Sequence, residues 1–582
     1  MLEWKDYGAG WPDIPYENFN SWLTGMEAMW KDRDAILYRT GKQREFSRWT
    51  YSFLADQCRR IARGLVRAGL KKGSRVVLWA ENSPEWMAVW LGTAIIGAVI
   101  VPVDNLLTED ECANILKLTR AEAFFYSERK QPLVDSFVKR GLSAVSVRID
   151  RDTFTGFGQD AADAVIPGPE TIAGQDPVSI VFTSGTTGFA KGVTLSHRGI
   201  ILNSSAAIRM LRADDHDVFL QVLPLHHTYP TTCTFISPLI IGAPIVIVEK
   251  LVGKVVVEAA RDSGATLLIA VPLLFDKLRE GIEAGYNKLP FPVRWALGLL
   301  RNIALKKAKN GHVEFGQKVF RFVRKRAGME KARLTVAGGG PLNPATADFF
   351  DSFGFNIVHG YGMSENGPLI SVNNSRFKRN SSVGLPVKYT EIKIIDPNEE
   401  GIGEIAIKSP SIMLGYFENP EATKEAITGD GWLLSGDLGF RDSDGFIYIS
   451  GRKKNLIVSS GGKNVYPEEI EKHFDLSRVV GQILVLGRRD ASGGEQIFAV
   501  IVPNREALAA DHAGKIPAEG ELDAAALEFI RSMVKKEVER VNRTLPGYKK
   551  IANFTLRLED FEMNAQKKIR RFLYAEYAKA PQ

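Results

Sequence analysis

Apolar and amphipathic segments alternate along the first part of the chain. Apolar residues recur at helical spacing in residues 51–68, 85–96 and 112–118, and each segment is followed by a short apolar run, in residues 75–80, 99–103 and 123–126. Further apolar runs occupy residues 218–223, 244–248, 267–270 and 334–337, and each ends near a glycine, proline or histidine. This alternation predicts a layered α/β fold, in which binding sites lie at the ends of strands.

The pattern changes after Val383. Short apolar runs with turn residues between them follow, as in EIKIIDPNEEG, GEIAIKSP and DGFIYISG, and they predict a smaller β-rich lobe. The stretch most like a linker is residues 504–521.

One apolar stretch, residues 86–103, imitates a membrane span because it holds 18 residues without a charge. It is at the short limit for a span and is interrupted by Gly97 and Pro102. A buried helix followed by a buried strand accounts for the same pattern. We therefore expect core structure here rather than a membrane segment.

Composition is that of a globular protein, with 582 residues, 45% hydrophobic and 25% charged. The three cysteines, Cys58, Cys112 and Cys233, are far apart and form no CxxC pair, which indicates a reducing compartment. The first residues lack the basic-then-apolar order of a signal peptide. We expect a cytoplasmic protein.

The formal net charge of +7 is concentrated in residues 291–333, which hold twelve Lys or Arg and two Glu. Apolar residues at helical spacing predict two basic amphipathic helices in this segment. They are either solvated helices packed on the core or a peripheral docking surface for anionic lipid, which neutralising Arg321, Arg324 and Lys325 would test. Nucleic acid is not favoured, because no recognised binding motif accompanies the charge.

The run TSGTTGFAKG, residues 183–192, follows the apolar run of residues 178–182. Glycines allow backbone N–H groups to converge on an anion, hydroxyl groups add donors, and Lys191 neutralises charge. The order of residues differs from GxxxxGK[ST], so a P-loop is not indicated. The pattern is that of a loop that binds a nucleotide triphosphate, and the alternative is an ordinary turn after a strand.

Five more motifs follow in order. They are GGGPL (338–342), HGYGMSE (359–365), SGDLGF (435–440), GRKKN (451–455) and KKIRR (567–571). Together with the TSGTTG run, the set resembles the adenylate-forming superfamily of acyl-CoA synthetases, luciferases and peptide-synthetase adenylation domains, over nearly the whole chain. This resemblance implies a large N-terminal domain, residues 1–452, and a small mobile C-terminal α/β domain, residues 453–582. The hinge between them would be Lys454. The alternative is that Lys454 is an ordinary surface lysine.

The resemblance implies an ATP and Mg²⁺ site. Activation requires an anionic carboxylate to approach an anionic phosphate, so cations and hydrogen-bond donors must stabilise the transition state. Lys568 would bridge the carboxylate and the α-phosphate, and Glu365 would bind Mg²⁺. The β- and γ-phosphates would be held by Thr183, Ser184, Gly185, Thr186, Thr187 and Lys191.

The nucleotide itself would lie on the glycine motif, with Tyr361 stacked on adenine and with Asp437 and Arg452 at the ribose hydroxyls. An Asp in this context is also a common turn residue. The other nucleotide-binding positions implied are Gly338, Gly339, Gly340, His359, Gly360, Gly362, Met363 and Ser364.

Adjacent histidines, His226 and His227, occur in LPLHHTYP. No HExxH, no CxxC and no nearby carboxylate cluster accompanies them, so the sequence does not favour a metal site. The segment resembles the family's proline-aromatic-histidine motif, which implies that His227 lies beside the acyl carboxylate.

For the thiol, SSGGKNVYPEEIE resembles the loop that admits pantetheine, with Gly461 or Gly462 close to the arm. Lys549 and Lys550 are candidate anchors for the phosphates of coenzyme A, although surface lysines are common.

Four positions depart from the family pattern. His359 stands where an amide is common, Ser364 and Ser435 replace threonine, and Lys567 replaces the glycine before the catalytic lysine. Serine keeps the hydroxyl group. Lys567 leaves open which lysine acts, and we predict Lys568 because it precedes Ile569.

The sequence is therefore identified as a member of the superfamily and predicts a long-chain fatty acid–CoA ligase that uses ATP, Mg²⁺ and coenzyme A. Alternatives are an aryl or medium-chain acid, a carrier protein or another acceptor in place of coenzyme A, and a non-catalytic lipid-binding scaffold. The scaffold is disfavoured because Lys191, Glu365, Asp437 and Lys568 are all present. Oligomeric state cannot be predicted from these motifs.

Overall fold

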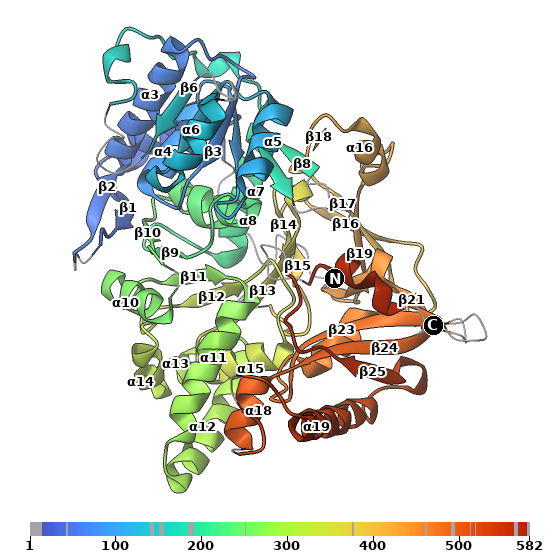
Figure 1. Cartoon of the computed structure of the whole chain (residues 1–582). Helices are drawn as coiled ribbons and strands as arrows, with labels where there is room; N and C mark the ends of the chain where they lie inside the picture. Colours follow the sequence, from blue (N-terminus) through green and yellow to red (C-terminus); the bar gives the residue numbers. More distant parts are fainter. Residues whose placement is uncertain are drawn as a thin grey trace.

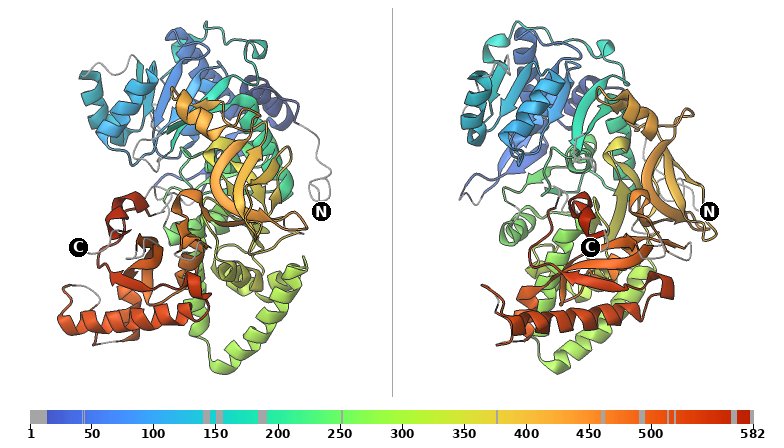
Figure 2. Two further views of the ribbon diagram at one scale, coloured as in Figure 1. Left: turned by 90° about the vertical axis from the view of Figure 1, so that its right-hand side faces the viewer. Right: turned by 45° about the vertical axis from the view of Figure 1, so that its right-hand side comes forward.

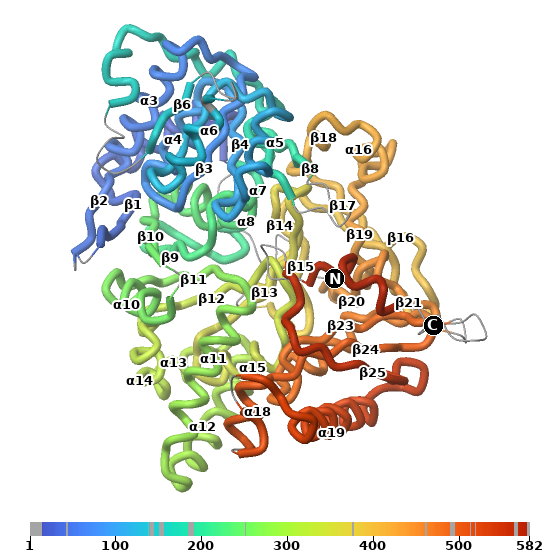
Figure 3. Tube along the Cα trace, in the orientation of Figure 1, coloured from blue at the N-terminus to red at the C-terminus, as the bar shows by residue number. Residues whose placement is uncertain are grey.

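Layered α/β sheets make up the large lobe of the protein, and a smaller α/β lobe packs beside it (Figure 1). The computed structural model describes residues 14–41, 43, 45–139, 145–149, 156–183, 191–250, 252–374, 377–459, 463–489, 495–512, 514–517, 520–563 and 569–578. Figure 3 traces the same path, in which the N-terminal sheets lie at one end and the C-terminal strands at the other.

The first sheet has seven strands in the order β18-β8-β7-β4-β3-β5-β6. Its members are β3 (Arg75–Trp79), β4 (Val99–Pro102), β5 (Ala123–Tyr126), β6 (Val145–Arg148), β7 (Pro177–Thr183), β8 (Lys191–Ser196) and β18 (Gly415–Tyr416). The strands β3 to β7 are parallel to their neighbours within this group, whereas β7 and β8 form an antiparallel hairpin. Helices α4 (Pro84–Ala94), α5 (Glu109–Thr119) and α6 (Gln131–Lys139) connect the parallel strands, and α3 (Tyr51–Arg67) leads into β3.

The uncharged stretch at residues 86–103 is core, as predicted. Helix α4 is buried along its whole length and leads into β4, which is buried on both faces. In the part of the chain that the structure describes, no helix has both the length and the apolar character that crossing a bilayer requires.

The second sheet has nine strands in the order β15-β14-β13-β12-β11-β9-β10-β1-β2. They are β1 (Asp34–Tyr38), β2 (Ser47–Thr50), β9 (Phe219–Gln221), β10 (Ile245–Ile247), β11 (Leu267–Ala270), β12 (Leu334–Ala337), β13 (Ile357–Gly362), β14 (Leu369–Val372) and β15 (Leu385–Pro386). Helix α7 (His197–Leu211) is buried against both sheets: Ile200 and Ile201 join the core of the first, and Ala206 and Met210 join that of the second. Helix α15 (Pro344–Ser352) lies between β12 and β13 in sequence.

The β-rich lobe expected after residue 383 is a four-stranded antiparallel sheet. Its strands are β16 (Glu391–Ile395), β17 (Gly403–Lys408), β19 (Leu433–Arg441) and β20 (Ile447–Arg452). Beyond it, β23 (Val480–Arg489), β24 (Glu495–Pro503) and β25 (Asn553–Leu556) form the sheet of the small lobe, and α19 (Ala524–Asn542) packs on it. The predicted fold class is confirmed.

Residues 504–521, expected to be linker-like, are ordered structure where they are described. Helix α18 (Arg505–Asp511) forms here, and Leu508 and Ile516 join the core of the small lobe. The prediction was wrong because a polar composition hides the two apolar residues that anchor the segment.

The basic segment is helical, as predicted. Helices α11 (Pro272–Asn287) and α12 (Phe291–Lys309) form a hairpin that projects from the body (Figures 1 and 2). The second predicted helix is divided into α13 (Glu314–Val319) and α14 (Arg321–Arg326) at Phe320, which is fully buried.

Candidate active site

The glycine turn follows β12 and is fixed by its neighbours. Gly338 N donates to Ala270 O at 3.0 Å, and Gly339 has a φ of +78°, which favours glycine. His359 Nε2 lies 2.9 Å from Gly340 O. Burial lowers the pKa of His359 to about 4, so the ring is neutral and its Nε2–H donates to the carbonyl oxygen. His359 therefore holds the turn that Gly338, Gly339 and Gly340 form.

A second group joins β13 to the antiparallel sheet. Tyr361 Oη donates to Asp437 Oδ2 at 2.7 Å, and Arg452 Nε pairs with Asp437 Oδ1 at 2.7 Å. Asp437 is only 5% exposed, and Ser435 Oγ accepts from its backbone N–H at 3.0 Å. The structure thus brings Tyr361, Asp437 and Arg452 together. Tyr361 was expected only to stack on adenine, but its hydroxyl also donates to the Asp437 carboxylate.

A third group lies at the start of β8. Thr183 pairs with Lys191 across the hairpin, and Lys191 Nζ lies 4.8 Å from the centroid of the Tyr416 ring. Tyr416 Oη donates to Glu365 Oε1 at 2.8 Å. Burial raises the pKa of Tyr416, and the Glu365 carboxylate raises it further, so the phenol stays protonated. Tyr416 connects the two predicted charges, and the sequence motifs give no sign of it.

The second and third groups are close to each other. Although burial opposes it, the carboxylates of Asp437 and Glu365 raise the pKa of Arg452. Ser364 and Glu365 belong to the short helix η5 (Ser364–Asn366), which follows Gly362 and Met363 at the end of β13. Gly360 pairs with Val372 on β14.

The adjacent histidines have a carboxylate neighbour that sequence spacing could not reveal. Asp104 Oδ2 lies 3.6 Å from His226 Nε2, and ligand atoms of Asp104, His226 and His227 all lie within 4.8 Å of one another. Burial lowers the pKa of both histidines, with the charge of His227 a further cause for His226. Both rings are therefore neutral, and their centroids lie 4.0 Å apart. Asp104 is close to His226 but makes no hydrogen bond to it within the described part of the chain.

An apolar cavity of about 50 Å³ adjoins the glycine turn. Helix α7 contributes Ala207 and Leu211, the sheet contributes Ile269 and Val336, and Gly338 and Gly339 line one side. Tyr229 also lines it, and its buried hydroxyl has no hydrogen-bond partner within the described part of the chain. The cavity is thus a hydrophobic space beside the predicted nucleotide position.

Several predicted site residues lie outside the described residues. They are Ser184, Gly185, Thr186, Thr187, Gly461, Gly462, Lys567 and Lys568. Lys454 lies in η6 (Lys453–Asn455), directly after β20, and is exposed. Lys549, a candidate anchor for coenzyme A, pairs with Glu469 at 2.6 Å, whereas Lys550 is exposed.

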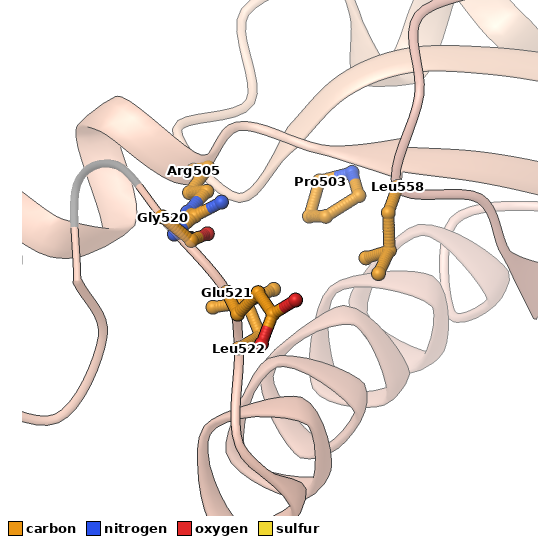
Figure 4. A pocket seen from close by; sticks show the side chains of 6 residues that line it. All are labelled: Pro503, Arg505, Gly520, Glu521, Leu522 and Leu558. Carbon is orange, nitrogen blue, oxygen red and sulfur yellow. The ribbon is translucent and has the colours of Figure 1, made fainter.

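A larger cavity of about 380 Å³ lies within the small lobe, away from these groups (Figure 4). Arg505 Nε and Nη2 donate to the carbonyl oxygens of Pro517 and Gly520 at 2.8 and 2.7 Å, so backbone carbonyl groups satisfy these two guanidinium donors. The lining residues are Pro503, Arg505, Gly520, Glu521, Leu522 and Leu558.

Known proteins resemble this chain over most of its length. The AMP-binding enzyme family matches residues 26–417. A long-chain-fatty-acid–CoA ligase of Gallus gallus is 31% identical over 479 residues, which are 76% of this chain and 62% of the relative, and a 4-coumarate–CoA ligase of Oryza sativa subsp. japonica is 29% identical over 76% of this chain and 78% of the relative. The structure of an anthranilate CoA ligase with anthranoyl-AMP is similar in fold, with a TM-score of 0.75 at 22% identity over 97% of this chain and 98% of that one. The chain belongs to the AMP-binding enzyme family and is an AMP-forming acyl-CoA ligase.

Proposed function

We propose that this ligase activates a long-chain fatty acid. The observation that carries the proposal is the apolar cavity beside the glycine turn, which offers an acyl group mostly hydrocarbon side chains. Of the two tyrosines that line it, Tyr361 already donates its hydroxyl to Asp437. The name of the relative from Gallus gallus supports the same substrate class. The basic segment before GGGPL adds support, since it resembles that of long-chain enzymes.

The size of the cavity favours a second candidate, an aryl or medium-chain acid. Ligand sites commonly measure about 300–1,000 Å³, whereas this cavity measures about 50 Å³. A long chain therefore requires the side chains that line it to move, and the bulkiest of them are Tyr229 and Tyr361.

The proposed first step joins the carboxylate to the α-phosphate of ATP and releases pyrophosphate. Lys191 and Thr183 would hold the phosphates, together with the loop that follows Thr183. His227 would lie beside the acyl carboxylate, since its buried ring is neutral and packs against His226. Lys568 would neutralise the two reacting anions.

Ribose binding at Asp437 is supported by the number of acceptor positions. A carboxylate has about four such positions, and Tyr361 and Arg452 occupy two. Two remain for two vicinal hydroxyl groups. Gly338, Gly339 and Gly340 would provide the flat backbone surface for adenine.

Glu365 fits the Mg²⁺ that this family uses. Its carboxylate oxygens are hard donors, and one of them already accepts from Tyr416, which fixes the side chain. When bound, Mg²⁺ neutralises phosphate charge. Glu365 would hold it, and Tyr416 would keep the Glu365 side chain in place.

In the second step the thiol of coenzyme A would attack the acyl carbon of the acyl-adenylate, forming the thioester as the bond to AMP breaks and AMP leaves, with Gly461 or Gly462 beside the pantetheine arm. We propose that residues 453–582 rotate about Lys454 between the steps, and that Lys550 is a phosphate anchor. A carrier protein or another acceptor is the alternative to coenzyme A in this step. A cytoplasmic enzyme in peripheral contact with the inner face of the membrane would meet long-chain acids where they partition.

The test is pyrophosphate release across fatty and aromatic acids of graded length, with and without coenzyme A. Sustained release that requires coenzyme A and is greatest for long chains supports the proposal. Greatest release with aromatic or medium-chain acids would show that these, and not long-chain acids, are the substrates. Release that is the same with and without coenzyme A would point to a different acyl acceptor.

The role of Lys568 is tested separately. Lys568→Ala should abolish adenylation, whereas Lys567→Ala should preserve it. The opposite pattern would assign the catalytic amine to Lys567.

A further inference from the structure

The N-terminal half of α12 carries apolar side chains that other described elements leave uncovered. The exposed fractions are 71% for Phe291, 63% for Trp295, 48% for Leu299 and 46% for Ile303. These residues are four apart, so they form one stripe along the helix. The sequence showed Leu299 and Ile303 at helical spacing and left open whether they pack on the core, and the structure leaves both exposed. An exposed aromatic stripe of this kind marks an interaction surface.

The two halves of α12 differ in their packing. Ala304 and Ala308 are buried at 1%, and Lys309 Nζ pairs with Asp348 of α15 at 2.8 Å, so the C-terminal half is fixed to the body. The N-terminal half is held by α11, where Tyr286 Oη donates to the backbone carbonyl of residue 294 at 2.6 Å. The stripe therefore lies on the projecting hairpin (Figure 2).

Part of the basic charge in residues 291–333 is already satisfied within the protein. Arg324 is 4% exposed and donates to the carbonyl oxygens of Met329 and Ala332, so it cannot meet lipid, contrary to the role in lipid docking expected from its charge. Arg321 pairs with Glu330 at 2.6 Å.

Six other cations of the segment are exposed and belong to no ion pair among the described residues: Lys306, Lys307, Lys318, Lys325, Arg326 and Lys331. Lys306 follows Ile303 by three positions and Leu299 by seven, which places it on the same helix face as the stripe. Apolar and cationic groups thus share one surface of α12.

We propose that the stripe on α12, with the cations that follow it, docks the enzyme onto a bilayer rich in anionic phospholipid. Phe291 and Trp295 enter the boundary between headgroups and acyl chains, and Lys306 and Lys307 contact the phosphates. A second copy of this chain fits less well, because it would bring two positively charged segments together. The inference rests on the proposed membrane contact and names its surface.

Helix α11 links this surface to the site. Its first residue, Pro272, lies against the glycine turn, because a Cβ on Gly340 would be 3.7 Å from the Pro272 ring. The hairpin that carries the stripe therefore begins at the edge of the proposed nucleotide position.

The first test measures flotation of the full chain with vesicles of phosphatidylcholine and phosphatidylglycerol. Phe291→Ser combined with Trp295→Ser should weaken partition by at least roughly tenfold, because two large side chains leave the bilayer. The matched control, Met29→Ser combined with Leu106→Ser, replaces two side chains that are 61% and 83% exposed elsewhere and should leave partition unchanged.

The second test changes charge alone. Lys306→Gln combined with Lys307→Gln should weaken partition by roughly fivefold per residue on anionic vesicles and should have little effect on pure phosphatidylcholine. Lys535→Gln combined with Lys536→Gln is the control, because this adjacent pair is exposed on α19 of the small lobe.

Equal flotation of the stripe variant and the parent protein would overturn the proposal. So would a stripe variant that changes from dimer to monomer in sedimentation without vesicles while its flotation is unchanged, since the stripe would then be an interface between copies. Ligase turnover of a water-soluble acid without vesicles should be the same in all variants. If the unaltered protein shows no turnover of any acid, the proposed function is wrong, whereas the docking proposal is not affected.

Discussion

Asp437 offers the most direct test of the proposed nucleotide site. Its side chain is 7% exposed, and both oxygens are engaged, one with Tyr361 and the other with Arg452, each at 2.7 Å. Asp437→Asn keeps the shape of the side chain but removes its charge and replaces one acceptor oxygen with a donor. The variant therefore loses acceptor positions for the ribose without creating a cavity.

The expected size of the effect follows from the type of bond. A hydrogen bond to a charged group contributes about 1.5–3 kcal/mol, so its loss should raise the KM for ATP by roughly 10- to 150-fold. The ribose does not react, so kcat at saturating ATP should change much less. Unfolding should be little affected, because Arg452, which loses its charge partner, has a side chain that is 41% exposed.

The assay is ATP-dependent pyrophosphate release at varied ATP concentration. Tyr361→Phe is the matched control, since it removes one neutral donor and leaves the carboxylate and the aromatic ring in place; we expect KM to rise by less than about tenfold. An unchanged KM in Asp437→Asn, together with a large rise in Tyr361→Phe, would show that the carboxylate does not bind ribose. The hydroxyl of Tyr361 would then be the recognising group.

Three further outcomes are expected. Gly338→Ala would place a Cβ 2.6 Å from Tyr229 Oη, so the ring must shift and the profile of kcat/KM against acid length should move toward smaller acids. Lys378→Met should lower the free energy of unfolding in urea by about 3–5 kcal/mol, because it leaves the fully buried Asp351 carboxylate without its cation at 2.6 Å. His359 has a pKa of about 4 in the fold, below its value of 6.5 in model compounds, so its protonation favours the unfolded chain. The free energy of unfolding should therefore be highest above pH 6.5 and should fall by about 3 kcal/mol as pH falls toward 4. In His359→Gln the free energy of unfolding should depend less on pH across this range.

The sequence predicted the parallel strands and their helices well because both faces of those elements are buried. Helix α4 and strand β4 are examples, because both are buried and together form one uncharged stretch. Gly97, with a φ of +70°, forms the turn between them. Strands of this kind appear as continuous apolar runs, and the helices between them keep their own period.

Contacts between distant segments could not be predicted in this way. Tyr416 lies on the two-residue strand β18, whose pairing with β8 brings it between Lys191 and Glu365. Asp104 reaches His226 from the loop after β4. Neither residue stands in a motif, so only the tertiary fold could show them.

Periodicity also failed to show which helix face is covered. Leu299 and Ile303 have the spacing of buried positions but are exposed, whereas Arg324 reads as a surface cation and is buried. The carbonyl groups that accept hydrogen bonds from Arg324 belong to the turn after α14, and a hydrophobic pattern carries no information about such acceptors.

Strand β13 links the two parts of the proposed nucleotide site, which has a testable consequence. His359 and Tyr361 are two residues apart and so lie on one face of the strand, where the first holds the glycine turn and the second holds Asp437. The start of β13 is fixed by Asp351, which accepts from the backbone N–H of residue 357 at 3.2 Å and pairs with Lys378. Disturbing this anchor should shift the turn and the carboxylate together. Lys378→Met should therefore raise the KM for ATP at temperatures where the protein is still folded, whereas an equally destabilising change in the core of the small lobe should not.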